Sequence, residues 1–89
     1  AVEPDFSPRH ALDAISLLEC FSWDEATFLS KTEGSAIRRI GFECWRRNVA
    51  IALGNAPSSP EISAALAAAL DDPSSLVREH VRWALAQHS

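Results

Sequence analysis

Apolar side chains recur along this chain every three or four residues, which is the spacing of one face of an α-helix. The segment 42–54 shows the pattern most clearly, because its apolar residues fall on one side of a helical wheel: Phe42, Trp45, Val49, Ala52 and Leu53. The sequence contains neither a run of alternating β-branched residues nor an Asn-Gly turn. The pattern therefore predicts an all-α protein.

Start and stop signals divide the chain into about five to six helices. A first short helix is expected over 13–21. Ser22, followed three residues later by Glu25, has the spacing of a capping box and predicts a second helix that reaches Lys31. Gly34 is expected to end this segment in a left-handed conformation.

The middle of the chain predicts a short helix followed by a long one. Ser35 is expected to cap a helix that runs to about Ile40. Gly41 then marks a bend or a close contact between helices, and the long helix 42–54 follows. Gly54 and Asn55 are expected to end that helix, because glycine and asparagine are common at a helix C-terminus.

Two further helices are expected after this point, and each has a start signal that includes proline. Ser59 is expected to cap a helix to Leu70 with Pro60 in its first turn. Asp72 and Pro73 repeat the signal and predict a last helix over 73–87.

The two longest helices have similar sequences. The block 45–53 resembles the block 77–85, 32 residues further on, and both end in an apolar residue followed by Ala-Leu. This spacing lies within the range of α-helical repeats that stack in pairs. We therefore expect a short α-solenoid of HEAT-like helix pairs over 12–89, preceded by a linker over 1–11 that carries two prolines and two acids in its first eight residues.

The composition excludes several classes of function. The 89 residues are enough for one small domain, and no apolar run is long enough to span a membrane. Cys20 and Cys44 lie 24 residues apart without a CxxC partner, which favours packed free thiols over a metal site or a disulfide. The histidines at 10, 80 and 88 have no metal-binding spacing, and the acidic, nucleophilic and basic residues form no local catalytic set.

Charge is unevenly distributed along this acidic chain. The net charge is −4, yet residues 34–60 carry four basic side chains and one acidic one: Arg38, Arg39, Arg46, Arg47 and Glu43. Arginine suits phosphate, because its planar group donates two parallel hydrogen bonds. A cationic strip that follows an RNA backbone is one interpretation. The other is a set of surface ion pairs between Glu43 and Arg47 or Arg39.

Other candidate residues also have a structural alternative. Arg46 lies at the edge of the apolar face, so it either contacts a ligand or covers Trp45 or a neighbouring helix. Asn48 either joins two helices or reaches an RNA base or ribose. Arg78 and Arg82 either brace the adjacent helix pair, for instance through an acid such as Asp72, or contact RNA. Trp45, Trp83 and His80 lie on apolar faces and are expected to be packed, whereas Trp23 has a better chance of exposure.

Two segments resemble a known family. SAIRRIGFECWRRNVAIALGN and LDDPSSLVREHVRWAL, in this order and after WDEATF, are similar to the C-terminal region of epoxyqueuosine reductase. The resemblance covers about residues 12–87. It implies a cytoplasmic bacterial enzyme that reduces epoxyqueuosine to queuosine in tRNA with cobalamin and two [4Fe–4S] clusters.

The resemblance also implies a division of labour. The cysteine-rich cluster motifs, a cobalamin-binding segment and the catalytic acid are absent from this sequence. The chain is therefore expected not to catalyse the reaction alone and to hold no cofactor. Its expected role is to bind tRNA around the anticodon stem-loop through Arg38, Arg39, Arg46, Arg47, Asn48 and Arg82. The alternative is a scaffold that braces the catalytic and ferredoxin-like domains, or another protein, without contacting RNA.

Overall fold

The computed structural model of the chain describes residues 14–89, and this part is all-α without strands. The elements in chain order are α1 (Ala14–Ser22), α2 (Glu25–Lys31), the 3₁₀ helix η1 (Ala36–Ile40), α3 (Phe42–Asn55), α4 (Pro60–Ala68) and α5 (Ser75–Gln87). The predicted fold class is thus confirmed. The linker predicted over 1–11 and the helix start predicted at Asp13 lie outside the described residues.

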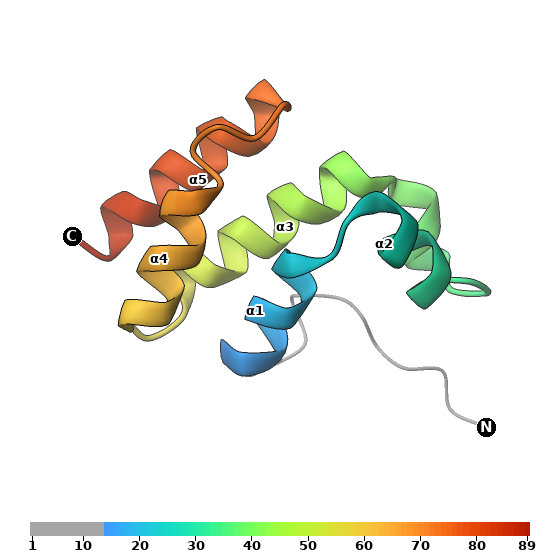
Figure 1. The fold of residues 1–89 in the computed structure, drawn as a ribbon, viewed down its shortest axis with the longest axis horizontal. Coiled ribbons are helices and arrows are strands. Elements are labelled where there is room, and N and C mark those ends of the chain that lie inside the picture. Colours follow the sequence, from blue (N-terminus) through green and yellow to red (C-terminus); the bar gives the residue numbers. More distant parts are fainter. Residues whose placement is uncertain (1–13) are drawn as a thin grey trace.

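Helix α3 runs through the middle of the molecule, with α5 beside it and α1 against its other side (Figure 1). Contacts at both ends show that α3 and α5 run in the same direction. Glu43 at the start of α3 meets Ser74 before α5, and Leu53 near the end of α3 meets His88 after α5. The two segments with similar sequences therefore lie side by side and parallel, as successive helical repeats would place them. The HEAT-like character of the pair stays a prediction.

The core forms where the apolar face of α3 meets the other helices. Trp45, Val49 and Leu53, which the helical wheel places on this face, are fully buried. The Trp45 ring lies 5.5 Å from the Phe28 ring of α2 and is stacked on Trp23, with 5.6 Å between the ring centroids. Aromatic contact with α3 thus anchors the short helix α2, which has too few residues to be stable alone.

The start of the second helix was predicted at the wrong residue. Asp24, not Ser22, is the N-cap of α2, and its carboxylate accepts a hydrogen bond from the Thr27 amide at 2.8 Å. Ser22 belongs to the end of α1, where its hydroxyl donates to the Glu19 carbonyl oxygen. The capping-box spacing therefore joined residues of two different helices, because Ser22 ends α1 and Glu25 is the first residue of α2. The caps predicted at Ser35 and Ser59 are confirmed, as is Pro60 in the first turn of α4.

The last helix also begins later than predicted. Ser74 caps α5 by accepting from the Val77 amide, and α5 starts at Ser75 rather than at Pro73. Asp72 instead accepts from the Ser74 amide and from a side chain of α3. Helix α4 ends at Ala68, two residues before the predicted end. Gly41 makes the predicted bend with φ of 84°, and a Cβ there would meet nothing within 4 Å, which excludes the alternative of a close helix contact.

Gly54 has a role beyond the one predicted. Helix α3 ends at Asn55, as predicted for the pair Gly54 and Asn55, and Gly54 is buried in its last turn. A Cβ added at Gly54 would lie 2.5 Å from Cζ3 of Trp83 and 3.0 Å from Cα of Ala84. Glycine here lets α5 approach α3 closely. It also places Trp83 on the outside of the seam, where 40% of the residue is exposed, so the prediction that Trp83 is a packed core residue was wrong.

Candidate functional site

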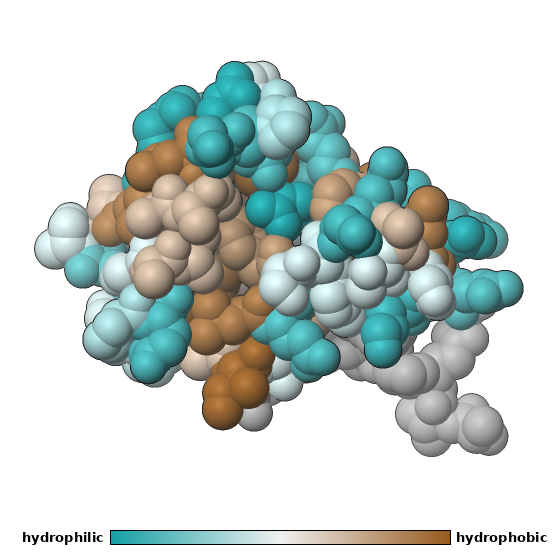
Figure 2. All heavy atoms as spheres, viewed as in Figure 1, coloured by the Kyte–Doolittle hydropathy of each residue, from teal (hydrophilic) through white to brown (hydrophobic). Residues whose placement is uncertain are grey.

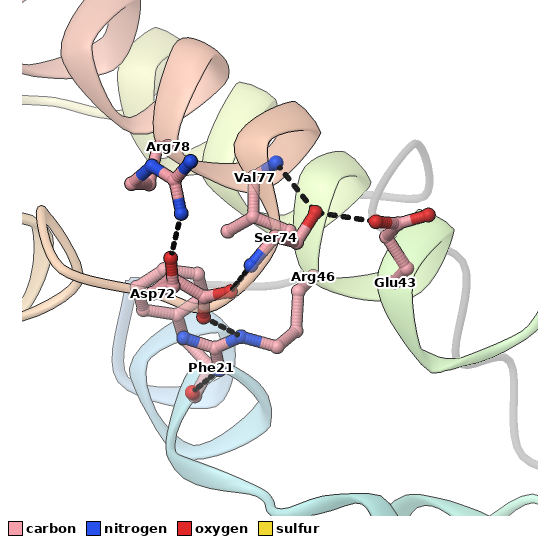
Figure 3. A network of polar contacts seen from close by, with 7 residues as sticks. All are labelled: Phe21, Glu43, Arg46, Asp72, Ser74, Val77 and Arg78. Atoms are coloured by element: carbon pink, nitrogen blue, oxygen red, sulfur yellow. Dashed lines mark hydrogen bonds and ion pairs between the residues drawn. The ribbon is translucent and has the colours of Figure 1, made fainter.

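Arg46 is held within the fold by contacts with two residues, Asp72 and Phe21 (Figure 3). Its Nε donates to the Asp72 carboxylate at 3.0 Å, and its Nη1 donates to the Phe21 carbonyl oxygen at 2.6 Å. The guanidinium carbon also lies 4.3 Å from the centre of the Phe21 ring, a cation–π contact. The side chains of Arg46 and Asp72 are 14% and 12% exposed. Arg46 therefore joins α1, α3 and the segment before α5, and the geometry favours the structural alternative for this residue.

Asp72 is the centre of this network. Besides Arg46, its carboxylate accepts from the Ser74 amide at 2.9 Å, and its carbonyl oxygen accepts from Arg78 Nη1 at 2.5 Å. Arg78 thus braces the loop before α5 as expected, through the backbone of Asp72 rather than through its carboxylate. Ser74 in turn donates to the Glu43 carboxylate of α3 at 2.5 Å. We call these five residues, Glu43, Arg46, Asp72, Ser74 and Arg78, the Asp72 network.

The surface ion pairs predicted for Glu43 are not formed in the described part of the chain. Glu43 accepts from Ser74 instead of pairing with Arg39 or Arg47. Arg47 donates from Nε and Nη2 to the side-chain oxygen of its neighbour Asn48, at 3.1 and 3.0 Å. Both side chains are half-buried on α3. Asn48 therefore orients Arg47, rather than joining two helices in the way that the sequence left open.

Three of the predicted arginines are exposed and have no polar partner within residues 14–89. Arg38 and Arg39 are consecutive residues of η1, which Ser35 caps and Gly41 ends. Arg82 is exposed on α5. A charged side chain that is exposed and unpaired is available to a ligand without first breaking a contact of the fold. The structure thus separates the six predicted residues into Arg46, which the fold uses, Arg47 with Asn48, and these three.

A groove between α3 and α5 was not anticipated from the sequence. It has a volume of about 320 Å³ and is lined by Ile51, Glu79, His80 and Trp83. His80 is half-buried, and its Nδ1 lies 2.8 Å from the Leu76 carbonyl oxygen, so it is hydrogen-bonded as predicted but not interior. The wheel assigned His80 and Trp83 to an apolar face. It could not show that this face continues past the core to the surface.

The C-terminal end of α5 is fixed by another residue that the sequence did not single out. His88 lies 2.6 Å from the Leu53 carbonyl oxygen through Nε2 and 2.6 Å from the Ser58 hydroxyl through Nδ1. Because a carbonyl oxygen can only accept, Nε2 carries a hydrogen. His88 thus ties the end of α5 to the end of α3 and to the loop that leads into α4.

The described residues do not fit an iron–sulfur cluster. Within residues 14–89, no three His, Cys, Asp or Glu side chains are grouped so that they could hold a metal ion. Cys20 and Cys44 are free thiols, and burial raises the pKa of the Cys20 thiol above its ordinary value. Burial favours the neutral form of this thiol. None of the described helices has the length and apolar character that crossing a membrane would require.

Known proteins with similar sequences are epoxyqueuosine reductases. That of Xanthomonas campestris pv. campestris is 59% identical over 86 residues, which are 97% of this chain and 24% of that protein. That of Pseudomonas aeruginosa is 56% identical over 84 residues, 94% of this chain and 23% of that protein. That of Salmonella typhimurium is 58% identical over 85 residues, 96% of this chain and 22% of that protein.

No family model matches the chain, and no solved structure matches it either. The chain spans about a quarter of the length of the relatives that it matches. The similarity nevertheless extends over nearly all of this chain at more than half identical residues. The domain therefore belongs to the epoxyqueuosine reductase family and corresponds to one part of that enzyme.

Proposed function

We propose that this domain binds tRNA for an epoxyqueuosine reductase, at or near the anticodon stem-loop. The observation that carries the proposal is the pair Arg38 and Arg39, two exposed guanidinium groups on one short helix with no acidic partner among residues 14–89. Each unpaired guanidinium group can donate charge-assisted hydrogen bonds to a phosphate without giving up a contact of the fold. An RNA backbone supplies such phosphates at regular intervals.

The other predicted residues would either contact phosphate directly or position a residue that does. Arg82 on α5 offers a third unpaired guanidinium group. Arg47 keeps Nη1 free of Asn48 and can share a phosphate through it. Arg46 acts indirectly, because it fixes α3 to the loop before α5 and so sets where Arg47 lies. Asn48 acts by orienting Arg47.

The domain's own residues supply binding, and the reduction would take place in other parts of the enzyme. Cobalamin and two [4Fe–4S] clusters, which the sequence resemblance implies for the whole enzyme, find no fitting ligand set among residues 14–89. No step of the reaction is therefore assigned to a residue of this domain. Holding the tRNA in place lowers the entropic cost of the reaction that follows, which is the contribution a binding domain makes to catalysis.

An apolar surface supports a second function, packing against the rest of the enzyme. Ile15 of α1 is 79% exposed and Leu70 after α4 is 43% exposed. Figure 2 shows apolar atoms gathered over α4 and the lower end of α1. The outer side of α4 carries Ala64, Ala67 and Ala68, which are exposed. A helix with little polar surface is typical of a buried element, and this face is distinct from the exposed arginines of η1.

Salt-dependent binding tests the RNA proposal. An anticodon stem-loop RNA is titrated with the protein at several salt concentrations, and the affinity is expected to fall linearly on a log–log plot. Arg38→Gln and Arg39→Gln should each lower the slope by about 0.7, because each variant takes away one cation that neutralises a phosphate. Lys31→Gln, an exposed cation on α2, is the matched control and should leave the slope nearly unchanged.

Circular dichroism should show unaltered helix content in all three variants, because none of these side chains contacts the core. Binding that does not depend on salt would overturn the proposal. So would arginine variants that behave like Lys31→Gln. In either case, the apolar face of α1 and α4 would become the better guide to what the domain does.

A further inference from the structure

We propose that the groove between α3 and α5 binds an unstacked guanine base of the RNA, with Trp83 as the stacking surface and Glu79 as the residue that reads the base edge. The inference rests on the RNA binding proposed above and names the base that the domain would hold. Four residues line the groove, Ile51, Glu79, His80 and Trp83, and they enclose about 320 Å³.

Trp83 provides a fixed aromatic surface. Its ring packs directly against α3 at Gly54. A Cβ atom added at Gly54 would lie only 2.5 Å from Cζ3 of Trp83. At the same time 40% of the residue is exposed. An aromatic ring that is held in place but open to solvent is what unstacked bases use as a platform, at about 1–3 kcal/mol per base. Ile51 adds an aliphatic wall to the groove.

His80 is engaged within α5, and Glu79 is the side chain that offers acceptors to the groove. His80 Nδ1 must carry a hydrogen, because its partner 2.8 Å away is the Leu76 carbonyl oxygen. The exposed Glu79 carboxylate has no hydrogen-bond or ion-pair partner in the described part of the chain. A ligand that fits this groove therefore presents an apolar face to Trp83 and hydrogen-bond donors to Glu79.

Guanine is the base whose edge presents adjacent donors to a carboxylate. Its Watson–Crick edge carries two adjacent donors, N1–H and the N2 amino group, which match the two oxygens of one carboxylate. Adenine and cytosine offer an amino donor beside an acceptor, and uracil offers one donor between two acceptors. Each of these would place an acceptor against the Glu79 carboxylate. Specific RNA recognition commonly combines stacking with such contacts to a splayed-out base.

Flanking charges favour a nucleotide over a protein side chain of similar shape. An arginine of a protein partner would also stack on Trp83 and pair with Glu79. However, Arg82 is the residue next to Trp83, and Arg47 lies one helical turn before Ile51 on α3. Positive groups near both walls attract the phosphates that accompany a base and oppose the approach of another guanidinium group.

The test uses the indole N–H signals of the protein in ¹H–¹⁵N NMR spectra. The Trp83 signal is assigned by its loss in Trp83→Phe, and guanosine and inosine 5′-monophosphates are the probes, since inosine lacks the N2 amino group. We expect a saturable shift of the Trp83 signal with the guanine nucleotide and about tenfold weaker binding of the inosine nucleotide, within the range for a bidentate base contact. Glu79→Gln should remove this preference, whereas Glu61→Gln, an exposed acid of α4 away from the groove, should keep it.

A second measurement repeats the comparison in RNA. Two stem-loops with the same number of phosphates, one with an unpaired loop guanine and one with inosine there, should differ about tenfold in affinity for the wild type and not for Glu79→Gln. Equal affinities together with a steep salt dependence would overturn the groove proposal and leave RNA docking standing. A Trp83 shift with the guanine nucleotide but no binding of either stem-loop would overturn the docking function and leave the base site. Stronger shifts with an arginine peptide would overturn the base in favour of a protein partner.

Discussion

The seam between α3 and α5 and the end of the molecule formed by α2 and η1 are stabilised in different ways. Along the seam, polar contacts between distant residues add to close packing: Arg46 with Asp72, Glu43 with Ser74, and His88 with the Leu53 carbonyl oxygen. At the other end the polar contacts are local. Asp24 and Ser35 cap their own helices, and the Thr32 hydroxyl donates to the Phe28 carbonyl oxygen one turn earlier.

The same residue type therefore has opposite uses in the two regions. Arg46 directs its hydrogen-bonding groups at the fold, and Arg78 contacts the same loop. Arg38 and Arg39 contact no polar group among residues 14–89 and project from a five-residue 3₁₀ helix. An arginine whose guanidinium group is hydrogen-bonded within the fold would lose those bonds on binding a ligand. An arginine without such bonds would lose none. The RNA binding proposed above would therefore use the end formed by α2 and η1 and the outer side of the seam.

Exchanging Arg46 for alanine is the change expected to have the largest effect. It leaves the Asp72 carboxylate and the Phe21 carbonyl oxygen without their partner in a site that is mostly closed to water. Breaking a buried pair by removing one partner costs about 3 kcal/mol or more. We expect Arg46→Ala to lower the free energy of unfolding by about 3 kcal/mol, measured by urea denaturation.

The neighbouring residue provides a matched control for this prediction. Arg47→Ala removes the same side chain from the same helix, but the hydrogen bonds that it takes away are those to the adjacent Asn48. A change of less than about 1 kcal/mol is expected there, as for most surface substitutions. Equal losses of stability in the two variants would show that the seam is not held by the Asp72 network.

The different roles of Arg46 and Arg47 could not be predicted from the sequence. The helical wheel placed the core face of α3 correctly, since periodicity depends on residues close in sequence. It could not choose between the alternatives for Arg46, because Asp72 is 26 residues away and Phe21 is 25 residues away. Contacts of this kind depend on how the helices pack, which no local pattern encodes.

The candidate site shows the same limit. Arg38, Arg39 and Arg82 could be named from charge alone, and their exposure agrees with a binding role. The groove could not be named, because it arises where Ile51 of one helix meets Glu79, His80 and Trp83 of another. One local signal was read only in part: Gly54 and Asn55 correctly indicated the end of α3, but the pattern could not show that Gly54 also serves a contact between helices.

The close packing at Gly54 is expected to be the next most sensitive feature of the seam. In Gly54→Ala, the new methyl group would meet Trp83 and the backbone of Ala84, and overpacking costs about 1–3 kcal/mol. The higher helix propensity of alanine returns about 1 kcal/mol. We expect a net loss of about 1 kcal/mol by urea denaturation, together with a shifted Trp83 indole signal.

Asn55→Ala is the control for this change, because Asn55 follows on the same helix and is exposed. It gains propensity without a clash and should not destabilise the protein. If Gly54→Ala were as stable as Asn55→Ala, α3 and α5 would not need the close approach that the structure shows. The placement of Trp83 as a fixed stacking surface would then lose its basis.

The smallest effect is expected at the cap of α2, where contacts are local and exposed. The hydrogen bonds from Thr27 hold the pKa of the Asp24 carboxyl below its ordinary value. A carboxyl whose pKa is lower in the folded state stabilises that state above the unfolded pKa, about 3.9, and this contribution disappears as the pH falls through the lower, folded-state pKa. Asp24→Ala should therefore lower Tm slightly at neutral pH, and its difference from the wild type should shrink in acid.

Asp24→Asn separates the charge from the cap, because asparagine accepts the same hydrogen bond without titrating. Its Tm should lie between those of the wild type and Asp24→Ala at neutral pH, and its own cap contribution should not vary with pH. A loss of stability in Asp24→Ala as large as that in Arg46→Ala would break the comparison, since α2 and η1 would then be tied into the fold as firmly as the seam. Arg38 and Arg39 would in that case stand on a rigid support, and the RNA binding proposed above would use a surface that is already ordered.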